Sequence, residues 1–344
     1  MTYLVDVLTG IQARVGDVWF MVLSIAITIL LCWFAIPVTT DLMVNHAAGI
    51  AGRIFGRSSR TLVINASTNN PELFSMVVSM GSKRMGGWAN PLGSLLANCY
   101  LMYLVGLLWV YAGFRFNGDR QSASRLVSLA WAERRLIGWH LFVALSTFGF
   151  GLVALRMMQG HVSWFGLAAA ANDASGSGSA GATNFPSTGF AMYISLALLL
   201  AGIAIFVFLE GRLKRKRPNL FLDIDDSSHG DSVIAFLIGT VGLIIACGLM
   251  NGLFLAWSNI YHENLTAVFG TAVFAGLHYV LGALITSLPE LRVATANYRK
   301  LTAADMNTAL ASASYSNFTN LVLCALGLGV FIVLSWWGYV MPWE

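Results

Sequence analysis

The sequence predicts an all-helical protein that crosses a membrane about eight times. Of its 344 residues, 57% are hydrophobic and only 10% are charged, whereas soluble domains carry about 25% charged residues. The 34 glycines and 11 tryptophans agree with a membrane protein, because glycine allows close helix packing in lipid and tryptophan favours the interface. The net charge of +4 is small, so membrane lipid rather than nucleic acid is the expected partner.

Eight segments are long and apolar enough to span, since a spanning helix needs about 20 mostly apolar residues. The first of them is not expected to be a secretory leader, because it is long enough to span and lacks a clear small-residue cleavage site. The eight segments lie near 17–45, 59–81, 89–114, 135–158, 188–210, 231–258, 264–291 and 306–340.

Three connecting stretches organise the chain. Residues 116–134 mix charged and apolar positions and predict an amphipathic connection at the interface, whereas 171–183 form a Gly/Ser/Ala linker. Residues 211–231 carry a basic run followed by an acidic one. This last stretch is predicted to be a cytoplasmic linker between a first membrane half of five helices, 1–210, and a second half of three, 232–344.

The basic residues predict an orientation. When the 211–217 run is placed in the cytoplasm and the sides alternate, sixteen of the 20 Lys and Arg residues fall on the cytoplasmic side. The positive-inside rule strongly favours this arrangement. We therefore expect an integral protein of the plasma (inner) membrane with both the N-terminus and the C-terminus outside.

Two of the apolar segments contain polar residues and a proline followed directly by a glutamate. The first reads NASTNNPELFS (65–75) with Glu72, and the second reads ITSLPE (285–290) with Glu290. A charge near the bilayer centre costs at least about 2.5–3.5 kcal/mol, so each glutamate must face a polar interior or bind something. Proline removes a backbone donor, and the carbonyls freed in this way can coordinate cations in broken transporter helices.

Each Pro-Glu segment is followed by a second polar helix. Ser94 and Asn98, like Ser316 and Asn320, are four residues apart and therefore share one helix face. The two copies, about 59–114 and about 264–340, run in opposite directions through the predicted topology. Such an inverted repeat places a substrate site at the midplane. A single copy could equally be structural, because Ser, Thr and Asn also hold membrane helices together.

The expected site contains only oxygen ligands and two negative charges. Carboxylate, hydroxyl and amide oxygens suit hard cations such as Ca²⁺ or Na⁺. Glu72 and Glu290 are the predicted metal ligands, and no His or Cys cluster indicates a softer metal. No resident cofactor is expected.

These motifs resemble those of the sodium/calcium exchanger family, the calcium/cation antiporters. That family carries a Gly-Thr-Ser-x-Pro-Glu motif on one helix of each repeat and a Gly-Ser-Asn-x-x-Asn/Asp motif on the next. TSLPE (286–290) matches the first motif closely and STNNPE (67–72) loosely, while Gly93, Ser94 and Asn98 match the second. In the second repeat Ser316, Asn317 and Asn320 match it, with Tyr315 in place of glycine.

The resemblance implies an inverted-repeat exchanger core with Glu72 and Glu290 as its central ligands. It implies further ion ligands in both halves: Thr68, Asn69, Ser94, Asn98, Thr286, Ser287, Ser316 and Asn320. Many relatives carry an aspartate at the place of Asn320, so this site has only two carboxylates, enough for one Ca²⁺ or two Na⁺. The family usually has ten helices where eight are predicted here, and a partner subunit or a second copy could take the place of the missing pair.

Antiport of Ca²⁺ or a similar divalent cation against Na⁺ or H⁺ is the leading functional hypothesis. The alternative is a non-transporting exchanger-like protein that acts as an ion sensor or assembly subunit. An enzyme is not expected, because the sequence contains no zinc-protease, phosphate-binding-loop or paired intramembrane aspartate motif. His140 and His278 are interpreted as packed, hydrogen-bonded residues, with proton coupling as the alternative. The isolated Cys32, Cys99, Cys247 and Cys324 are interpreted as core residues.

Overall fold

A computed structural model describes residues 2–54, 60–81, 90–158, 189–221, 230–261 and 287–338. Every regular element in these ranges is a helix. The α-helices are α1 (Thr2–Val15), α2 (Asp17–Leu30), α3 (Ile36–Ile54), α4 (Arg60–Thr68), α5 (Asn70–Gly81), α6 (Asn90–Tyr100), α7 (Gly106–Phe116), α8 (Arg120–Ala132), α9 (Arg134–Met158), α11 (Gly189–Lys216), α12 (Val233–Ile260), α15 (Leu288–Tyr298) and α16 (Ala303–Trp336). Two π-helical turns, η1 (Leu31–Ala35) and η4 (Leu101–Val105), and a 3₁₀ turn, η5 (Pro218–Phe221), complete them.

Six helices within these ranges are long and apolar enough to cross a membrane, so the chain is an all-helical, membrane-embedded protein. They agree with six of the eight predicted segments. These candidate spans are Asp17–Ile54, Pro91–Phe116, Arg134–Met158, Ala191–Lys216, Val233–Phe254 and Ala303–Trp336.

The other two predicted segments have different outcomes. Segment 59–81 is not one helix but two, α4 and α5, separated at Asn69. Most of segment 264–291 lies outside the described residues, as does the 171–183 linker. The predicted amphipathic connection contains the helix α8, and the N-terminal helix α1 was not predicted.

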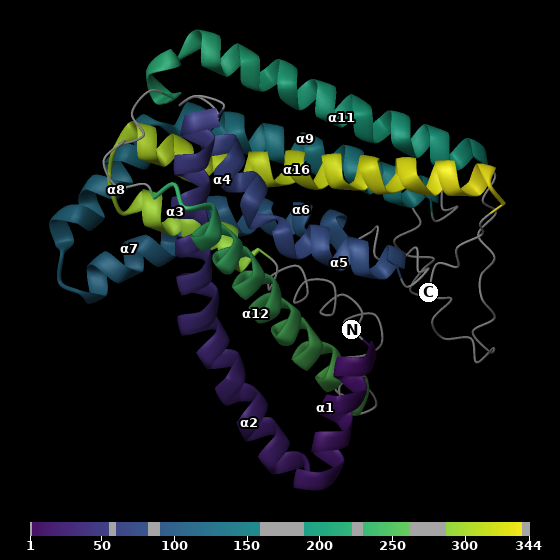
Figure 1. Ribbon diagram of the computed structural model, residues 1–344. Coiled ribbons are helices and arrows are strands. Elements are labelled where there is room, and N and C mark those ends of the chain that lie inside the picture. Colours follow the sequence, from purple (N-terminus) through teal and green to yellow (C-terminus); the bar gives the residue numbers. More distant parts are fainter. Residues whose placement is uncertain are drawn as a thin grey trace.

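Helix α16 lies at the centre of one part of the molecule. It packs against α9, α11, α6, α15 and α4, and it runs alongside α9 and α11 in Figure 1. Its buried face is rich in small residues such as Ala309, Ala313 and Ser314, which let neighbouring helices approach closely. The polar positions of α16 are therefore surrounded by helices on several sides.

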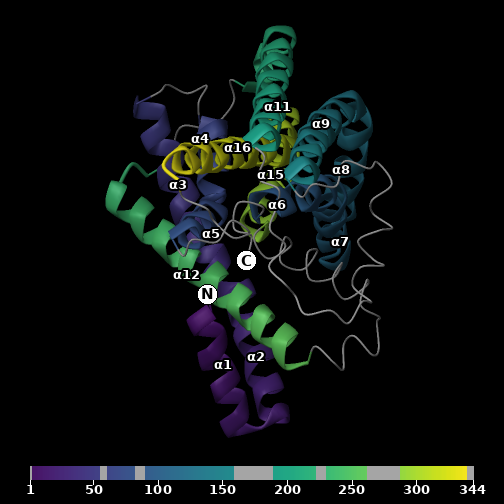
Figure 2. The same cartoon turned by 90° about the vertical axis from the view of Figure 1, so that its right-hand side faces the viewer.

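Helices α3 and α12 form the second part, together with α1 and α2. These helices project from the α9–α11–α16 layer in both cartoon views (Figures 1 and 2). The contact between α3 and α12 is close: a Cβ on Gly239 would lie 2.6 Å from the Met43 backbone nitrogen, so a larger residue there would push the helices apart. Helix α1 packs along α12 and extends this group.

The turn η1 interrupts the long helix between α2 and α3. Pro37 follows it and has no backbone N–H to donate to the carbonyl four residues earlier. Loss of that bond accounts for a wide π turn at this place rather than a regular one.

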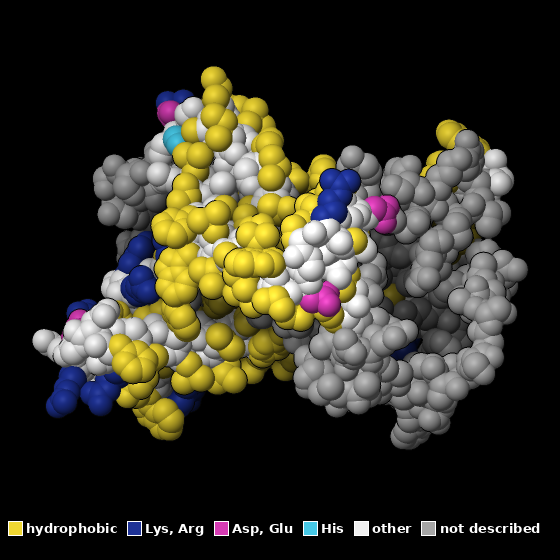
Figure 3. Space-filling view, turned by 90° about the horizontal axis from the view of Figure 1, so that it is seen from below, with side chains coloured by type: hydrophobic (Ala, Val, Ile, Leu, Met, Phe, Trp, Pro, Cys, Tyr) yellow, Lys and Arg dark blue, Asp and Glu magenta, His cyan; other side chains and the backbone are white. Residues whose placement is uncertain are grey.

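The surface agrees with a lipid environment. Apolar side chains cover most of the middle of the face in Figure 3, and most of its basic side chains lie toward one edge. Exposed apolar residues on α2 and α12 include Val22, Ile29, Ile238 and Ile245. A continuous apolar exterior of this kind is stable only where lipid replaces water.

One end of the bundle, called here the basic end, gathers the ends of several helices. Arg217, just after α11, donates to both carboxylate oxygens of Glu133 before α9 (2.6 and 3.1 Å). This hydrogen-bonded guanidinium lowers the pKa of Glu133. Arg53 near the end of α3 pairs with Asp231 before α12, and Asn307 in α16 donates to the Leu220 carbonyl of η5 (3.3 Å).

Candidate functional site

The first Pro-Glu segment sits at a break between two helices. Helix α4 ends at Thr68, Asn69 forms a turn, and α5 begins at Asn70. Pro71 cannot donate to the carbonyl of Ser67, which explains why the helix stops here. Glu72 consequently lies in the first turn of α5, where the positive end of the helix dipole favours a carboxylate.

The second Pro-Glu segment has the same local arrangement. Helix α15 begins at Leu288, with Pro289 in its first turn. Proline is favoured there because its missing N–H would have no partner in any case. Glu290 therefore occupies the first turn of α15, as Glu72 does in α5. The residue before the helix, Ser287, is fully buried, and its hydroxyl does not cap the helix.

Helices α6 and α16 bring hydroxyl and amide groups to both glutamates. The Ser94 hydroxyl donates to Glu72 Oε1 at 3.0 Å. The Ser316 hydroxyl lies 3.2 Å from Glu290 Oε1 and 2.8 Å from Asn69 Oδ1, so it can donate to either. Asn98 Nδ2 in turn donates to Ser316 Oγ at 2.9 Å. Ser316 thus links residues from the two halves of the chain.

The two carboxylates are buried and close enough for their charges to repel each other. Glu72 is 1% exposed and Glu290 is fully buried. Thr68, from the first half of the chain, also hydrogen-bonds to Glu290. Within the ranges that the structure describes, no lysine or arginine forms an ion pair with Glu290. Two carboxylates in such a site remain charged only when a cation accompanies them.

Several buried polar atoms around the glutamates have no hydrogen-bond partner within the described ranges. An atom left in this way costs about 1–3 kcal/mol, and each instance in a folded protein calls for an explanation such as a bound ion or water. They are Glu290 Oε2, Ser287 Oγ, Asn98 Oδ1, and both Oδ1 and Nδ2 of Asn320. All of these atoms except the Asn320 amide nitrogen are oxygens, which are the atoms that coordinate a hard cation.

Most of the predicted site residues lie together. Seven of them form hydrogen bonds in two groups: Glu72 with Ser94, and Glu290 with Thr68, Ser316, Asn69 and Asn98. Ser287 and Asn320 are fully buried and have no side-chain partner in the part of the chain that the structure describes, and Thr286 lies outside that part. These nine described residues are called the double-glutamate cluster below. No group of three His, Cys, Asp or Glu side chains in the described ranges could hold a softer metal.

Asn317 was not predicted as part of the site, yet it holds the cluster in place. Its Oδ1 accepts from Asn98 at 3.1 Å, and its Nδ2 donates to the carbonyls of Leu95 and Ala144, both at 3.2 Å. Asn317 therefore fastens α16 to α6 and α9. The only sequence signal that could have indicated this role is the position of Asn317 in the motif, directly after Ser316.

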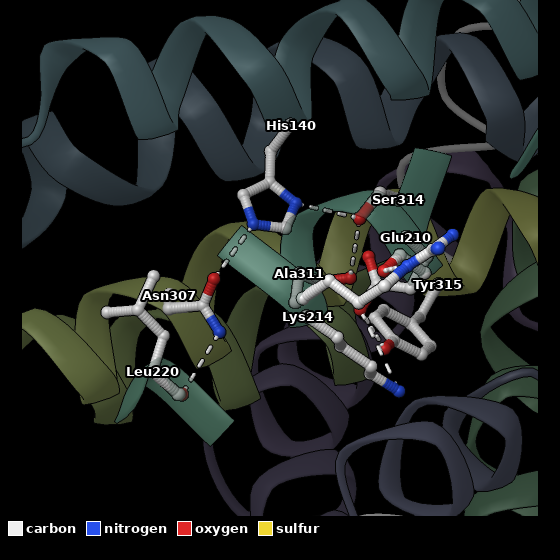
Figure 4. Close-up of polar contacts among 10 residues, drawn as sticks. His140, Glu210, Lys214, Leu220, Asn307, Ala311, Ser314 and Tyr315 are labelled. Carbon is white, nitrogen blue, oxygen red and sulfur yellow. Dashed lines mark hydrogen bonds and ion pairs between the residues drawn. The ribbon is translucent and has the colours of Figure 1, made fainter. Parts of the chain in front are cut away.

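A second buried polar group lies on another face of α16 (Figure 4). His140 of α9 donates from Nε2 to Asn307 Oδ1 (3.0 Å), and its Nδ1 lies 3.1 Å from Ser314 Oγ. Tyr315 donates to Glu210 of α11, whose carboxylate also lies 4.0 Å from Lys214. We call this set the histidine–glutamate network (His140, Glu210, Lys214, Asn307, Ser314 and Tyr315). The interpretation of His140 as a packed, hydrogen-bonded residue is confirmed, and His278 lies outside the described residues.

The four cysteines are free, and Cys99, Cys247 and Cys324 are buried, in agreement with their interpretation as core residues.

Comparisons of the chain with protein-family models, with curated proteins and with solved structures found no match.

Proposed function

We propose that this protein is a secondary-active cation antiporter that exchanges Ca²⁺, or a similar divalent cation, for Na⁺ or H⁺. The observation that carries the proposal is the meeting of Glu72 and Glu290, which are 218 residues apart in the chain but are both buried and close enough for their charges to interact. Thr68 and Ser316, from opposite halves of the chain, both hydrogen-bond to Glu290. The unpartnered oxygens around them are those of a cation shell. The proposed ligands are those of the double-glutamate cluster together with Thr286.

Exchange follows from the charge of the site. Two carboxylates balance one Ca²⁺, two Na⁺ or two protons, so each kind of ion competes for the same groups. A site that stays charged while buried is unfavourable without an ion. The protein can therefore change its access from one side to the other far more easily when loaded, which is the condition for obligatory exchange.

The packing supports an inverted repeat of eight membrane segments. Helix α3, before the first Pro-Glu segment, packs against α12, before the second, and α6 packs against α16. Helix α5, which carries Glu72, contacts α12, and α15, which carries Glu290, contacts α3. This reciprocity is expected when two halves are related by a pseudo-twofold axis in the membrane plane.

The basic end supports the proposed orientation. It joins Arg217 to Glu133 and Arg53 to Asp231, all in stretches assigned to the cytoplasm. The proposed location is the plasma (inner) membrane, with both termini outside and the 211–231 linker inside.

The test is ⁴⁵Ca²⁺ uptake into proteoliposomes under an imposed Na⁺ gradient, repeated with a pH gradient. We expect gradient-driven uptake by the wild type and background uptake by the Glu72→Gln/Glu290→Gln variant. The variant should fold, because the substitution removes two buried like charges and keeps their shape. Wild-type activity in the double variant would contradict the site.

Equilibrium ⁴⁵Ca²⁺ binding to the same proteins separates the alternative function. Binding without uptake under either gradient would favour a sensor or assembly subunit over an antiporter.

A further inference from the structure

Thr40 on α3 is fully buried, and its hydroxyl has no hydrogen-bond partner in the described part of the chain. Six other helical threonines, by contrast, donate to the carbonyl four residues earlier. That group comprises Thr9, Thr39, Thr147, Thr295, Thr308 and Thr319. For Thr40 this carbonyl would be that of Ile36, which already lies 3.2 Å from the Thr39 hydroxyl. A buried hydroxyl that forms no bond to its own backbone needs another partner.

The packing of α3 shows which part of the molecule Thr40 faces. Val44, one turn after Thr40, packs with Ile64 of α4 and Val293 of α15. Helix α4 continues by one turn from Ile64 to Thr68, and the first turn of α15, before Val293, contains Glu290.

The directions of the three helices make these steps coincide. Helices α3 and α15 run toward the basic end, whereas α4 is joined to α3 by five residues, packs against it and runs back. A step of one helical turn away from the basic end therefore leads from Val44 to Thr40 on α3, from Ile64 to Thr68 on α4, and from Val293 to Glu290 on α15. Because Thr68 hydrogen-bonds to Glu290, these steps place Thr40 on the side of α3 that faces α4 and α15, at the level of that pair.

An ion pair fixes this register. Arg292, two residues after Glu290, donates from Nη2 to Asp41 Oδ2 at 2.8 Å and from Nε to Asp41 Oδ1 at 3.2 Å. A bidentate contact of this kind restrains both the distance and the rotation of the two helices. The residue next to Asp41 is Thr40, so its position relative to the first turn of α15 is restrained as well.

We infer that the Thr40 hydroxyl is a further neutral oxygen ligand of the cation held by Glu72 and Glu290. The inference rests on the proposed function and extends the site to α3, a helix outside both polar-Pro-Glu and Ser-x-x-x-Asn segments. A neutral ligand raises the coordination number without adding charge, which matters most for Ca²⁺ with its 6–8 oxygen ligands. Thr40 therefore favours the divalent cation over Na⁺.

The experiment measures equilibrium ⁴⁵Ca²⁺ binding to purified full-length protein, with Na⁺ as competitor. Thr40→Val removes the hydroxyl and keeps the shape, and Thr40→Ser keeps the hydroxyl. Thr39→Val is the matched control, since its hydroxyl bonds to its own helix at Ala35 O (2.6 Å). Melting temperatures in detergent show whether each variant folds.

We expect Thr40→Val to weaken Ca²⁺ binding about tenfold, the loss typical of one contact to a charged group. Na⁺ should then compete more effectively, Thr40→Ser should bind Ca²⁺ like the wild type, and Thr39→Val should change little. Wild-type affinity in a folded Thr40→Val protein would overturn the assignment of Thr40 and leave the proposed function standing. Failure of the wild type to bind either cation would overturn both.

If Thr40→Val does not fold, Thr40→Ala and Thr40→Ser replace it. Equal Ca²⁺ affinities in those two variants would contradict the inference, whereas weaker binding by Thr40→Ala alone would support it.

Discussion

Helix α16 carries two buried polar clusters that differ in how fully their atoms are hydrogen-bonded. In the histidine–glutamate network, both ring nitrogens of His140 have partners, and so do both amide atoms of Asn307. In the double-glutamate cluster, Asn320 lies on the same helix and is fully buried, yet neither of its amide atoms has a partner among the residues that the structure describes. A network whose members are satisfied stabilises the fold, whereas unpartnered polar atoms lower stability until a ligand binds. This difference in hydrogen bonding assigns a structural role to the histidine–glutamate network and a binding role to the double-glutamate cluster, although both contain the same types of residue.

The strongest test of these two roles is to replace one asparagine in each cluster by alanine. Asn307→Ala leaves His140 Nε2 and the Leu220 carbonyl without their partner and should lower the free energy of unfolding by about 1–3 kcal/mol. Asn320→Ala removes no hydrogen bond and should cost less, while weakening Ca²⁺ binding about tenfold. Both substitutions delete the same atoms, so the cavity contributions are matched.

Melting temperatures without added cation and ⁴⁵Ca²⁺ affinities check this pair. The comparison fails if Asn320→Ala destabilises the cation-free protein as much as Asn307→Ala, or if Asn307→Ala reduces affinity more than Asn320→Ala does.

A smaller effect is expected from Tyr315→Phe, which tests the histidine–glutamate network next to the site. The substitution removes the hydroxyl that donates to Glu210 and keeps the edge-on ring contact with Phe206, whose centroid lies 5.3 Å away. The free energy of unfolding should fall by about 1 kcal/mol, because Lys214 still neutralises Glu210. Cation affinity should stay within about twofold of the wild type. A larger loss of affinity would show that the two clusters are coupled through Tyr315 and Ser316.

The smallest effect is expected at the basic end, where a surface ion pair provides a reference for the buried clusters. Glu133→Gln should lower stability at pH 7 by no more than about 1 kcal/mol, because Arg217 remains well solvated. The pKa of Glu133 is lowered in the folded protein, so its contribution is present above the usual value of 4.5. It is lost as the pH falls through the lowered folded pKa.

The difference in melting temperature between wild type and Glu133→Gln should therefore shrink from pH 7 toward acid. A difference that grows on acidification would mean that the pair does not act through the charge of Glu133.

The sequence predicted the long apolar helices and the amphipathic connection that contains α8 because these depend on local composition and periodicity. Pro71 indicated a disturbed helix, since a proline removes a hydrogen bond wherever it lies in a helix, but the separation of segment 59–81 into two helices at Asn69 was not predicted. The short helix α1 was missed because its 14 residues are too few to span, and it packs instead along α12. Such a helix has no strong signal until its packing partner is known.

The candidate site was predictable in its residue types but not in its partners. Repeated motifs indicated Glu72, Glu290, Ser94 and Ser316. Asn317 links α16 to α6 and α9, and the Thr40 hydroxyl is buried without a partner in the described part of the chain. Both features depend on which helices meet in space. Contacts between residues more than 200 positions apart follow from tertiary packing, which local patterns do not determine.

The π turn η1 separates two stretches of one long helix that meet different surroundings. A π turn accommodates one residue more than a regular turn, so it behaves as an insertion absorbed inside a helix. A deletion of one residue within Leu31–Ala35 would therefore convert the π turn into a regular turn and leave α2 close to its present orientation relative to α3. Thr40 and Asp41 would keep their register with α15, because the ion pair to Arg292 lies beyond the turn. The length of the helix can thus change at η1, while α3 keeps its register beside the glutamates.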